Sequence, residues 1–176
     1  MKYIINHGWP FSSTAFEIES ESRQKAYRVT RGFFGRGYSL TNAAGEALLV
    51  LRDVGIIKSV FQIWRDEAMI GSVTYERGMK SRYRVMAGDV RAFGIQPNFW
   101  RTRFDFVNQE GRLAVFTSPS LLPPRPATLE IFDERQELMA LAATIAVIKI
   151  THRALLARNR TSFTMPWGYW GRAGGQ

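Results

Sequence analysis

The sequence contains no cysteine and only two histidines, His7 and His152, which lie far apart. Without cysteine the chain forms neither a disulfide nor a thiolate metal site, and two distant histidines lack the spacing of zinc ligands. The chain also lacks a G-x-S-x-G nucleophile elbow, a G-x-x-x-x-G-K-[ST] phosphate loop and an H-E-x-x-H metal motif. We therefore predict no metal, no cofactor and no catalytic residue, and we expect that the protein is not an enzyme.

Acidic residues are scarce relative to basic ones. The 24 basic and 15 acidic residues give a formal charge of +9, and 19 of the basic residues are arginine. The planar guanidinium group matches phosphate geometry, so this surplus favours anionic partners, either lipid headgroups or nucleic acid. An arginine surplus that only keeps the protein soluble explains the same composition equally well.

Long hydrophobic runs are also rare. The first ten residues contain a single three-residue apolar run, which is shorter than the core of a secretory signal. We expect a cytoplasmic protein, attached peripherally at the inner membrane face if it binds lipid.

A triplet of apolar, polar and apolar residues recurs along most of the chain, which is typical of strands with one buried face. A short polar turn and a second apolar run follow each triplet, which indicates a hairpin, and Gly45 and Gly111 suit turns that need positive φ. Six hairpins give about twelve antiparallel strands, and a meander of this length removes its exposed edges by closing into a barrel. The triplets are Phe16-Glu17-Ile18, Tyr38-Ser39-Leu40, Phe61-Gln62-Ile63, Tyr83-Arg84-Val85, Phe104-Asp105-Phe106 and Leu129-Glu130-Ile131.

The longest apolar run, residues 138–148, predicts a slim helix that is apolar on every side and therefore buried. At about 1.5 Å per residue it is too short to span a bilayer, and a longer span would include Lys149, His152 and Arg153. A twelve-stranded barrel is too wide for its own side chains to fill. The predicted fold class is therefore mainly β, a closed barrel of about twelve strands around a central C-terminal helix over about 136–150, with no transmembrane span.

The barrel domain is expected over residues 1–157, and the helix is expected to reach the barrel end near Lys149. Residues 158–176 form a basic, aromatic and glycine-rich tail. Its Trp167, Tyr169 and Trp170 suit two roles, an anchor at a membrane interface or a cover over one barrel mouth.

The hairpin repeat, the loop pairs Phe33-Phe34 and Phe99-Trp100, and the closing segment QELMALAATIAVIKI resemble the superfamily of Tubby C-terminal domains, phospholipid scramblases and LURP-one-related proteins. The short bacterial LURP-one-like members are the most similar, over about residues 1–152. The resemblance implies a twelve-stranded barrel around a central helix. It also implies membrane chemistry, because Tubby domains bind phosphoinositides and scramblases are linked to phospholipid movement and calcium. This chain has no cysteine cluster for palmitoylation and no acidic segment after the helix, which argues against lipid scrambling.

Charge is divided between the two expected barrel ends. The connections between hairpins hold nine basic residues against Asp53 alone, whereas the turns within hairpins hold ten acidic residues against six basic ones. The sequence therefore predicts a basic end and an acidic end. The connections are residues 30–37, 53–60, 77–82, 96–103 and 117–127, and the turns are residues 19–25, 41–47, 64–68, 86–91, 107–112 and 132–137.

The basic end also carries the apolar pairs Phe33-Phe34, Ile56-Ile57 and Phe99-Trp100. We favour the interpretation that these pairs fold inward and plug the barrel mouth over their exposure to a membrane. The functional hypothesis is a non-catalytic module that binds anionic phospholipid headgroups. A scaffold for an acidic protein partner and a binder of single-stranded nucleic acid are alternatives that use the same surface. The predicted contact residues are Arg31, Arg36, Lys58, Lys80, Arg82, Arg101 and Arg103.

Overall fold

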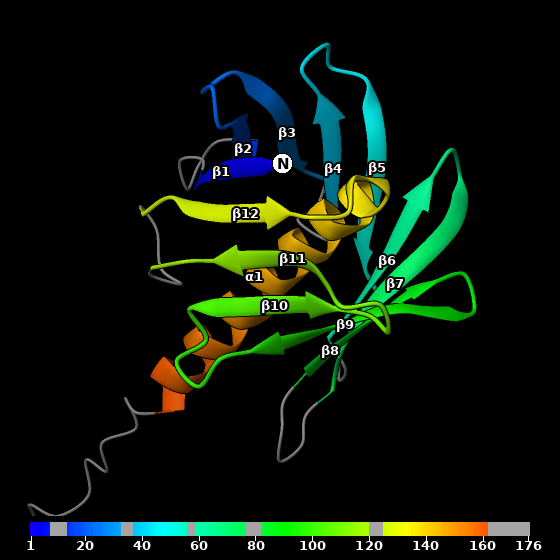
Figure 1. Ribbon diagram of the computed structural model, residues 1–176. Coiled ribbons are helices and arrows are strands. Elements are labelled where there is room, and N and C mark those ends of the chain that lie inside the picture. The colour runs from blue at the N-terminus through cyan, green and yellow to red at the C-terminus, as the bar shows by residue number, and fades with distance from the viewer. Residues whose placement is uncertain (8–13, 33–36, 56–58, 77–81, 120–124, 162–176) are drawn as a thin grey trace, which may run out of the picture.

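A computed structural model describes residues 1–7, 14–32, 37–55, 59–76, 82–119 and 125–161, with side chains as far as residue 154. In these residues, twelve antiparallel strands form a closed barrel around one long helix (Figure 1). The predicted fold class is therefore confirmed. The strands are β1 (Lys2–His7), β2 (Thr14–Ser20), β3 (Lys25–Arg31), β4 (Gly37–Asn42), β5 (Ala47–Asp53), β6 (Val60–Arg65), β7 (Ala68–Glu76), β8 (Arg82–Ala87), β9 (Val90–Pro97), β10 (Arg103–Val107), β11 (Arg112–Thr117) and β12 (Ala127–Ile131).

The barrel closes between the first and the last strand. β1 pairs with β12 in antiparallel register, with Lys2 opposite Glu130 and Ile5 opposite Ala127. The sixth triplet lies in β12 and leads into the helix and not into a return strand. The N-terminal strand supplies the missing partner and removes both open edges of the sheet.

The period-2 pattern of the triplets places one residue inside and the next outside. Phe61 and Ile63 are fully buried in β6, whereas Gln62 between them is only partly buried. The same alternation recurs in β8, where Tyr83 and Val85 are buried and Arg84 is exposed. The inward side chains form one continuous hydrophobic core with the helix.

The central helix α1 (Glu137–Thr161) follows a short 3-10 helix, η2 (Glu134–Gln136). All side chains of residues 140–148 are buried, as expected for a helix that is apolar on every side. Burial continues through Thr151 and ends at the exposed Arg153, close to the predicted barrel end near residue 149. The helix itself runs beyond its expected end near 150, so residues 158–161 of the expected tail are helical.

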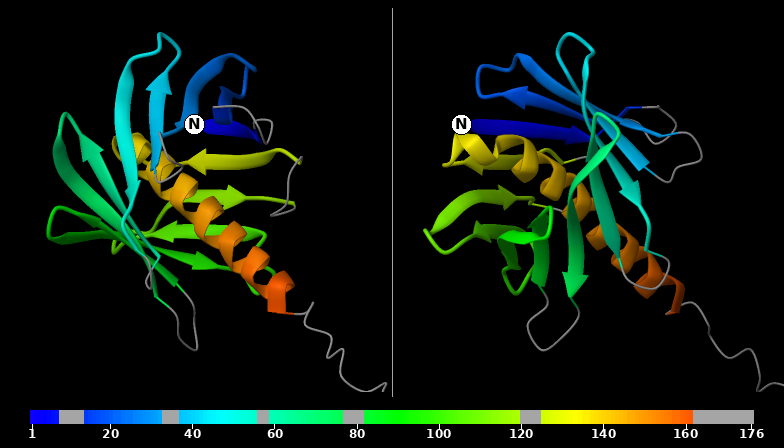
Figure 2. Two further views of the ribbon diagram at one scale, coloured as in Figure 1. Left: turned by 180° about the vertical axis from the view of Figure 1, so that it is seen from behind. Right: turned by 90° about the vertical axis from the view of Figure 1, so that its right-hand side faces the viewer.

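Glu137 holds the start of α1 against the strands. Its carboxylate accepts hydrogen bonds from the hydroxyls of Tyr3 in β1 and Tyr27 in β3, the latter at 2.6 Å. Both tyrosines lie beside hairpin turns, so α1 enters the barrel at the end formed by the turns. The helix then crosses the barrel and leaves at the opposite end, which the connections between hairpins form (Figure 2).

Candidate anion-binding surface at the basic end

Four of the seven predicted contact residues lie in the described part of the chain. Arg31 ends β3, Arg82 begins β8 and Arg103 begins β10, so antiparallel order places all three at the end of the barrel formed by the connections. Arg101 belongs to the β9–β10 connection at the same end. We call this the basic end. Arg36, Lys58 and Lys80 lie outside the described residues, as do the pairs Phe33-Phe34 and Ile56-Ile57 and the tail residues Trp167, Tyr169 and Trp170.

Arg82 is held by a carboxylate on the neighbouring strand. Its Nε donates to Glu76 Oε2 at 2.7 Å, and Arg84 forms an ion pair with the other carboxylate oxygen. The hydrogen bond from Arg82 holds the pKa of Glu76 below its usual range. Two guanidinium groups thus share one carboxylate, and the group keeps a net positive charge.

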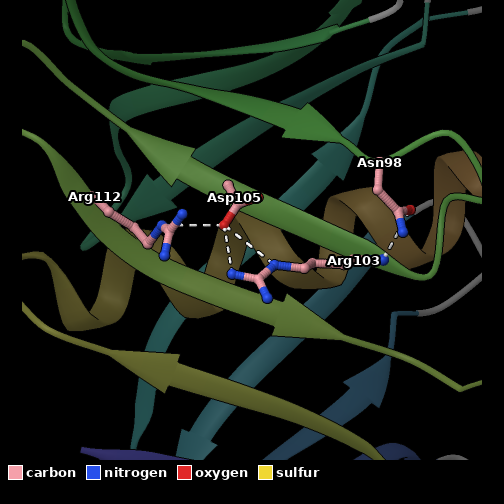
Figure 3. Close-up of polar contacts among 4 residues, drawn as sticks. All are labelled: Asn98, Arg103, Asp105 and Arg112. Atoms are coloured by element: carbon pink, nitrogen blue, oxygen red, sulfur yellow. Dashed lines mark hydrogen bonds and ion pairs between the residues drawn. The ribbon is translucent and has the colours of Figure 1, made fainter.

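Arg103 has a similar arrangement on the outer face of β10 (Figure 3). Its Nη2 lies 3.2 Å from Asp105 Oδ1, and the Nε of Arg112 lies 3.1 Å from the same oxygen. Both arginine side chains are about half exposed. Exposed ion pairs of this kind add little stability, about 0–1 kcal/mol, and leave the guanidinium groups accessible to a competing anion.

The β9–β10 connection is a braced turn that presents two aromatic residues to solvent. The Asn98 carboxamide oxygen accepts the backbone N–H of Thr102 at 2.9 Å and that of Arg103 at 3.2 Å. Between these contacts, Phe99 is 89% exposed and Trp100 is 76% exposed. Their rings pack edge to face with centroids 5.0 Å apart.

The interpretation that the aromatic pairs plug the barrel mouth was therefore wrong for Phe99 and Trp100. The backbone hydrogen bonds of the turn fix both residues at its tip, so their side chains face solvent. Arg101 follows directly in the left-handed region at φ 55°, and its Nη2 donates to the Tyr75 hydroxyl at 3.3 Å. We call Phe99, Trp100 and Arg101 the aromatic turn.

The end of α1 adds charges that the predicted set did not include. Arg153 forms an ion pair with Asp53 at the end of β5, and its guanidinium lies 5.8 Å from the ring centroid of Phe61. One turn earlier, the Lys149 ammonium lies 4.9 Å from the ring centroids of both Phe16 and Tyr38. The i, i+4 spacing of these two cations directly after the apolar run is the sequence signal for this feature.

Lys149 lies in an environment that disfavours its charge. Burial, together with the nearby charges of Arg31 and Arg153, lowers its pKa to about 8. The pKa of His7 is lowered by burial and by the charges of Lys149 and His152. Burial and Lys149 also lower the pKa of His152. These groups are therefore close enough to repel one another.

A buried hydrogen bond fixes the helix between Lys149 and Arg153. The Thr151 Oγ1 and the Tyr83 hydroxyl are 3.0 Å apart, and burial raises the pKa of Tyr83 to about 12. Tyr83 lies near the start of β8 and also packs against Tyr75, which contacts Arg101. The helix end and the aromatic turn are thus connected through a continuous set of contacts.

The described part of the chain shows neither a cluster of metal ligands nor a membrane-spanning helix. No three or more histidine or acidic side chains gather there in a way that would hold a metal ion. No helix in this part is both long and apolar enough to cross a bilayer. Among the described residues, the basic end presents arginine side chains and the exposed rings of Phe99 and Trp100.

The architecture defines the class of protein as a closed antiparallel barrel with a central C-terminal helix. A solved structure with a similar fold is the X-ray structure of a protein from Arabidopsis thaliana, with a TM-score of 0.60 and 11% sequence identity. The match covers 86% of this chain and 91% of the plant protein. At this identity the similarity concerns the fold alone. No protein-family model and no curated protein matches the sequence.

Proposed function

We propose that this protein is a non-catalytic module that binds anionic phospholipid headgroups at a membrane surface through its basic end. The observation that carries the proposal is the aromatic turn, in which Phe99 and Trp100 are exposed directly beside Arg101. Exposed aromatic rings enter the interfacial layer of a bilayer, and neighbouring cations attract anionic lipids. Arg31 and Arg103 at the same barrel end extend the cationic surface.

The rigidity of the aromatic turn supports this proposal. An exposed apolar side chain on a mobile loop loses conformational freedom when it binds, whereas the hydrogen bonds of Asn98 already fix this turn. The resemblance to Tubby C-terminal domains, which bind phosphoinositides, points to the same class of ligand. We propose membership of that superfamily together with this function.

Co-sedimentation with vesicles tests the proposal. We expect the protein to bind vesicles that contain phosphatidylglycerol and to bind neutral phosphatidylcholine vesicles much more weakly. The double substitution Arg31→Ser and Arg101→Ser should weaken binding at least tenfold, since each cation near an anionic surface contributes about 1 kcal/mol. The matched control is Arg23→Ser with Arg65→Ser, which removes the same charge at the acidic end and should bind like the wild type.

Two outcomes would contradict this function. Equal binding to neutral and anionic vesicles would exclude the electrostatic part of the mechanism. Equal loss of binding in the two double variants would show that net charge and not the basic end is responsible. A gel shift with single-stranded oligonucleotides, together with no vesicle binding, would instead favour the nucleic-acid alternative.

A further inference from the structure

Five basic or imidazole side chains surround the point where α1 leaves the barrel. Lys149, His152 and Arg153 come from the helix, and His7 and Arg31 come from the ends of β1 and β3. We call these five residues the mouth cluster. Lys149 and Arg153 differ from the outer arginines of the basic end because their charges lie over buried aromatic rings of the barrel interior, those of Phe16, Tyr38 and Phe61.

The positive charge of Lys149 in the mouth cluster is poorly compensated. In the part of the chain that the structure describes, no carboxylate lies within ion-pair distance of Lys149, whose ammonium contacts only the faces of aromatic rings. Asp53 is the carboxylate at this site, and Arg153 occupies one of its oxygens. Among the described residues, the Tyr38 hydroxyl also faces the cluster: burial raises its pKa, and the charges of Arg153, Arg31 and Asp53 act on it as well. The charge of Arg101 acts on Tyr83, whose hydroxyl is hydrogen-bonded to Thr151 of the helix.

Asp53 provides a second, independent observation. Its side chain is only 10% exposed, and its Oδ1 is buried without a hydrogen-bond partner among the described residues. A buried oxygen without a donor is costly, so few are found in native proteins. A ligand that carries a hydroxyl next to its negative charge would satisfy Asp53 and the cations together.

We propose that the mouth cluster binds the phosphate group of a phosphate ester that carries a neighbouring hydroxyl, with Lys149 and Arg153 as the main donors to the phosphate oxygens. This site deepens the proposed function and rests on it for one point, the membrane as the source of the ligand. The phosphate belongs either to a lipid headgroup such as phosphatidylglycerol or to a soluble ester. Phosphate accepts charge-assisted hydrogen bonds from both kinds of cation. The two histidines gain protons when the anion binds, because its charge stabilises their protonated forms.

Calorimetric titration of the full chain with glycerol 3-phosphate tests the site. Wild-type protein should bind it, and Lys149→Met should weaken binding about tenfold or more, since one charge-assisted hydrogen bond is lost. Methionine keeps the length of the apolar stem, so the fold should be retained. The matched control is Lys25→Met, which removes the same charge at the acidic end, where Lys25 pairs with Glu17, and should bind like the wild type.

The histidines are tested with sulfate, whose own charge does not change in this range of pH. Sulfate affinity should rise as the pH falls from about 7.5 to about 5.5, because His7 and His152 then become protonated. The double substitution His7→Gln and His152→Gln should remove most of this rise and leave the small part that comes from Lys149, whose pKa is about 8. Sulfate affinity that does not depend on pH, or the same rise in the double variant, would overturn the role of the histidines.

Vesicles of phosphatidylglycerol separate this inference from the proposed function. If glycerol 3-phosphate binds and Lys149→Met weakens it but no variant of the protein binds vesicles, the site is real and its ligand is soluble. If vesicles bind fully to both the wild type and Lys149→Met while glycerol 3-phosphate binds to neither, the mouth site is overturned and the membrane function stands. If Lys149→Met and Lys25→Met weaken the binding of glycerol 3-phosphate equally, the proposed site is also overturned.

Discussion

Arg153 in the C-terminal half of α1 forms an ion pair with Asp53, the final residue of β5. This contact fixes the exit of the central helix to the rim of the barrel and shows that the helix leaves at the basic end. Lys149 and Arg153 therefore add to the positive charge of that end. The apolar run of residues 138–148 thus forms part of the core of the fold, and Lys149 and Arg153, which follow it in the same helix, form part of the candidate binding surface.

The Arg153–Asp53 pair should stabilise the barrel. Arg153→Gln leaves a carboxylate that is only 10% exposed without its charged partner, and we expect the free energy of unfolding to fall by about 1–3 kcal/mol. Urea unfolding followed by circular dichroism measures the change. Arg135→Gln breaks the pair with Asp133 at the opposite end, in which the arginine side chain is 82% exposed, and should leave stability unchanged. Equal stability of the two variants would contradict the assigned role.

The carboxylate of Glu137 should be essential for the position of the helix start. Glu137→Ala removes the carboxylate that accepts from the hydroxyls of Tyr3 and Tyr27, which should cost about 1–3 kcal/mol of stability. Glu137→Gln retains an acceptor oxygen and should cost clearly less. Thermal unfolding of both variants tests this order, and the reverse order would exclude the hydrogen bonds as the cause.

The raised pKa values of Tyr3 and Tyr27 predict that the folded protein loses stability at high pH. Burial, with the Glu137 carboxylate as a further cause, raises the pKa of Tyr27 to about 12 and also raises that of Tyr3. The folded state therefore favours the neutral phenols, and this stability is present below pH 10.0, the ordinary tyrosine pKa, and is lost as the pH rises towards 12. Tyr27→Phe should reduce the loss of stability across this range, as measured by urea unfolding at each pH. An identical pH dependence in wild type and variant would contradict it.

The lowered pKa of Lys149 predicts that stability changes with pH in the opposite direction, over a lower range of pH. Its pKa of about 8 in the folded protein lies below the ordinary value of 10.5, so between these values the unfolded chain binds more protons than the folded one. Stability should therefore rise with pH from about 8 to 10 in the wild type relative to Lys149→Met. The difference between their unfolding free energies at the two pH values measures this effect. A constant difference would show that Lys149 is not desolvated.

Gly71 should tolerate no side chain. A Cβ at this position in β7 would lie 2.3 Å from the Met86 backbone oxygen and 3.0 Å from Met139 Cε of the helix. Because the obstructing oxygen belongs to the neighbouring strand, Gly71→Ala should destabilise the barrel by about 1–3 kcal/mol. Gly94→Ala is the control, because its Cβ would lie 2.8 Å from the end of the Arg91 side chain and at an ordinary contact distance of 3.8 Å from the nearest backbone atom, the Tyr83 oxygen. Equal stability of both variants would contradict this packing.

Much of the fold could be predicted from the sequence because it depends on local patterns. Triplets such as Phe61-Gln62-Ile63 report a strand with one buried face, and the slim apolar segment 138–148 suits the centre of a wide barrel. The closing pair of β1 and β12 was not predicted, because their residues lie more than 100 positions apart and no local pattern reports such a pairing.

The candidate site was predicted less completely than the fold. Hydrophobicity alone favours burial of Phe99 and Trp100, and their exposure follows from the hydrogen bonds that Asn98 makes within the turn. The mouth cluster was also missed, since it forms only when the helix end and the ends of β1 and β3 meet in space. Arg31, Arg82, Arg101 and Arg103 do lie at the predicted end.

The apolar part of the membrane contact has its own test. The double substitution Phe99→Ser and Trp100→Ser should weaken binding to phosphatidylglycerol vesicles by roughly 30-fold or more, since two side chains lose their transfer from water. The control removes exposed apolar residues at the acidic end, Val90→Ser with Phe132→Ser, and should bind like the wild type. If both double variants bind equally well, the aromatic turn does not contact the membrane.

The most direct test of the central claim is the environment of Trp100 when the protein meets a bilayer. The difference between the tryptophan fluorescence of the wild type and Trp100→Phe isolates this residue from the other four tryptophans. On addition of phosphatidylglycerol vesicles, the difference spectrum should shift to the blue as the indole enters the interface, and phosphatidylcholine vesicles should cause no shift. Binding to anionic vesicles with no shift of the Trp100 spectrum would contradict the account.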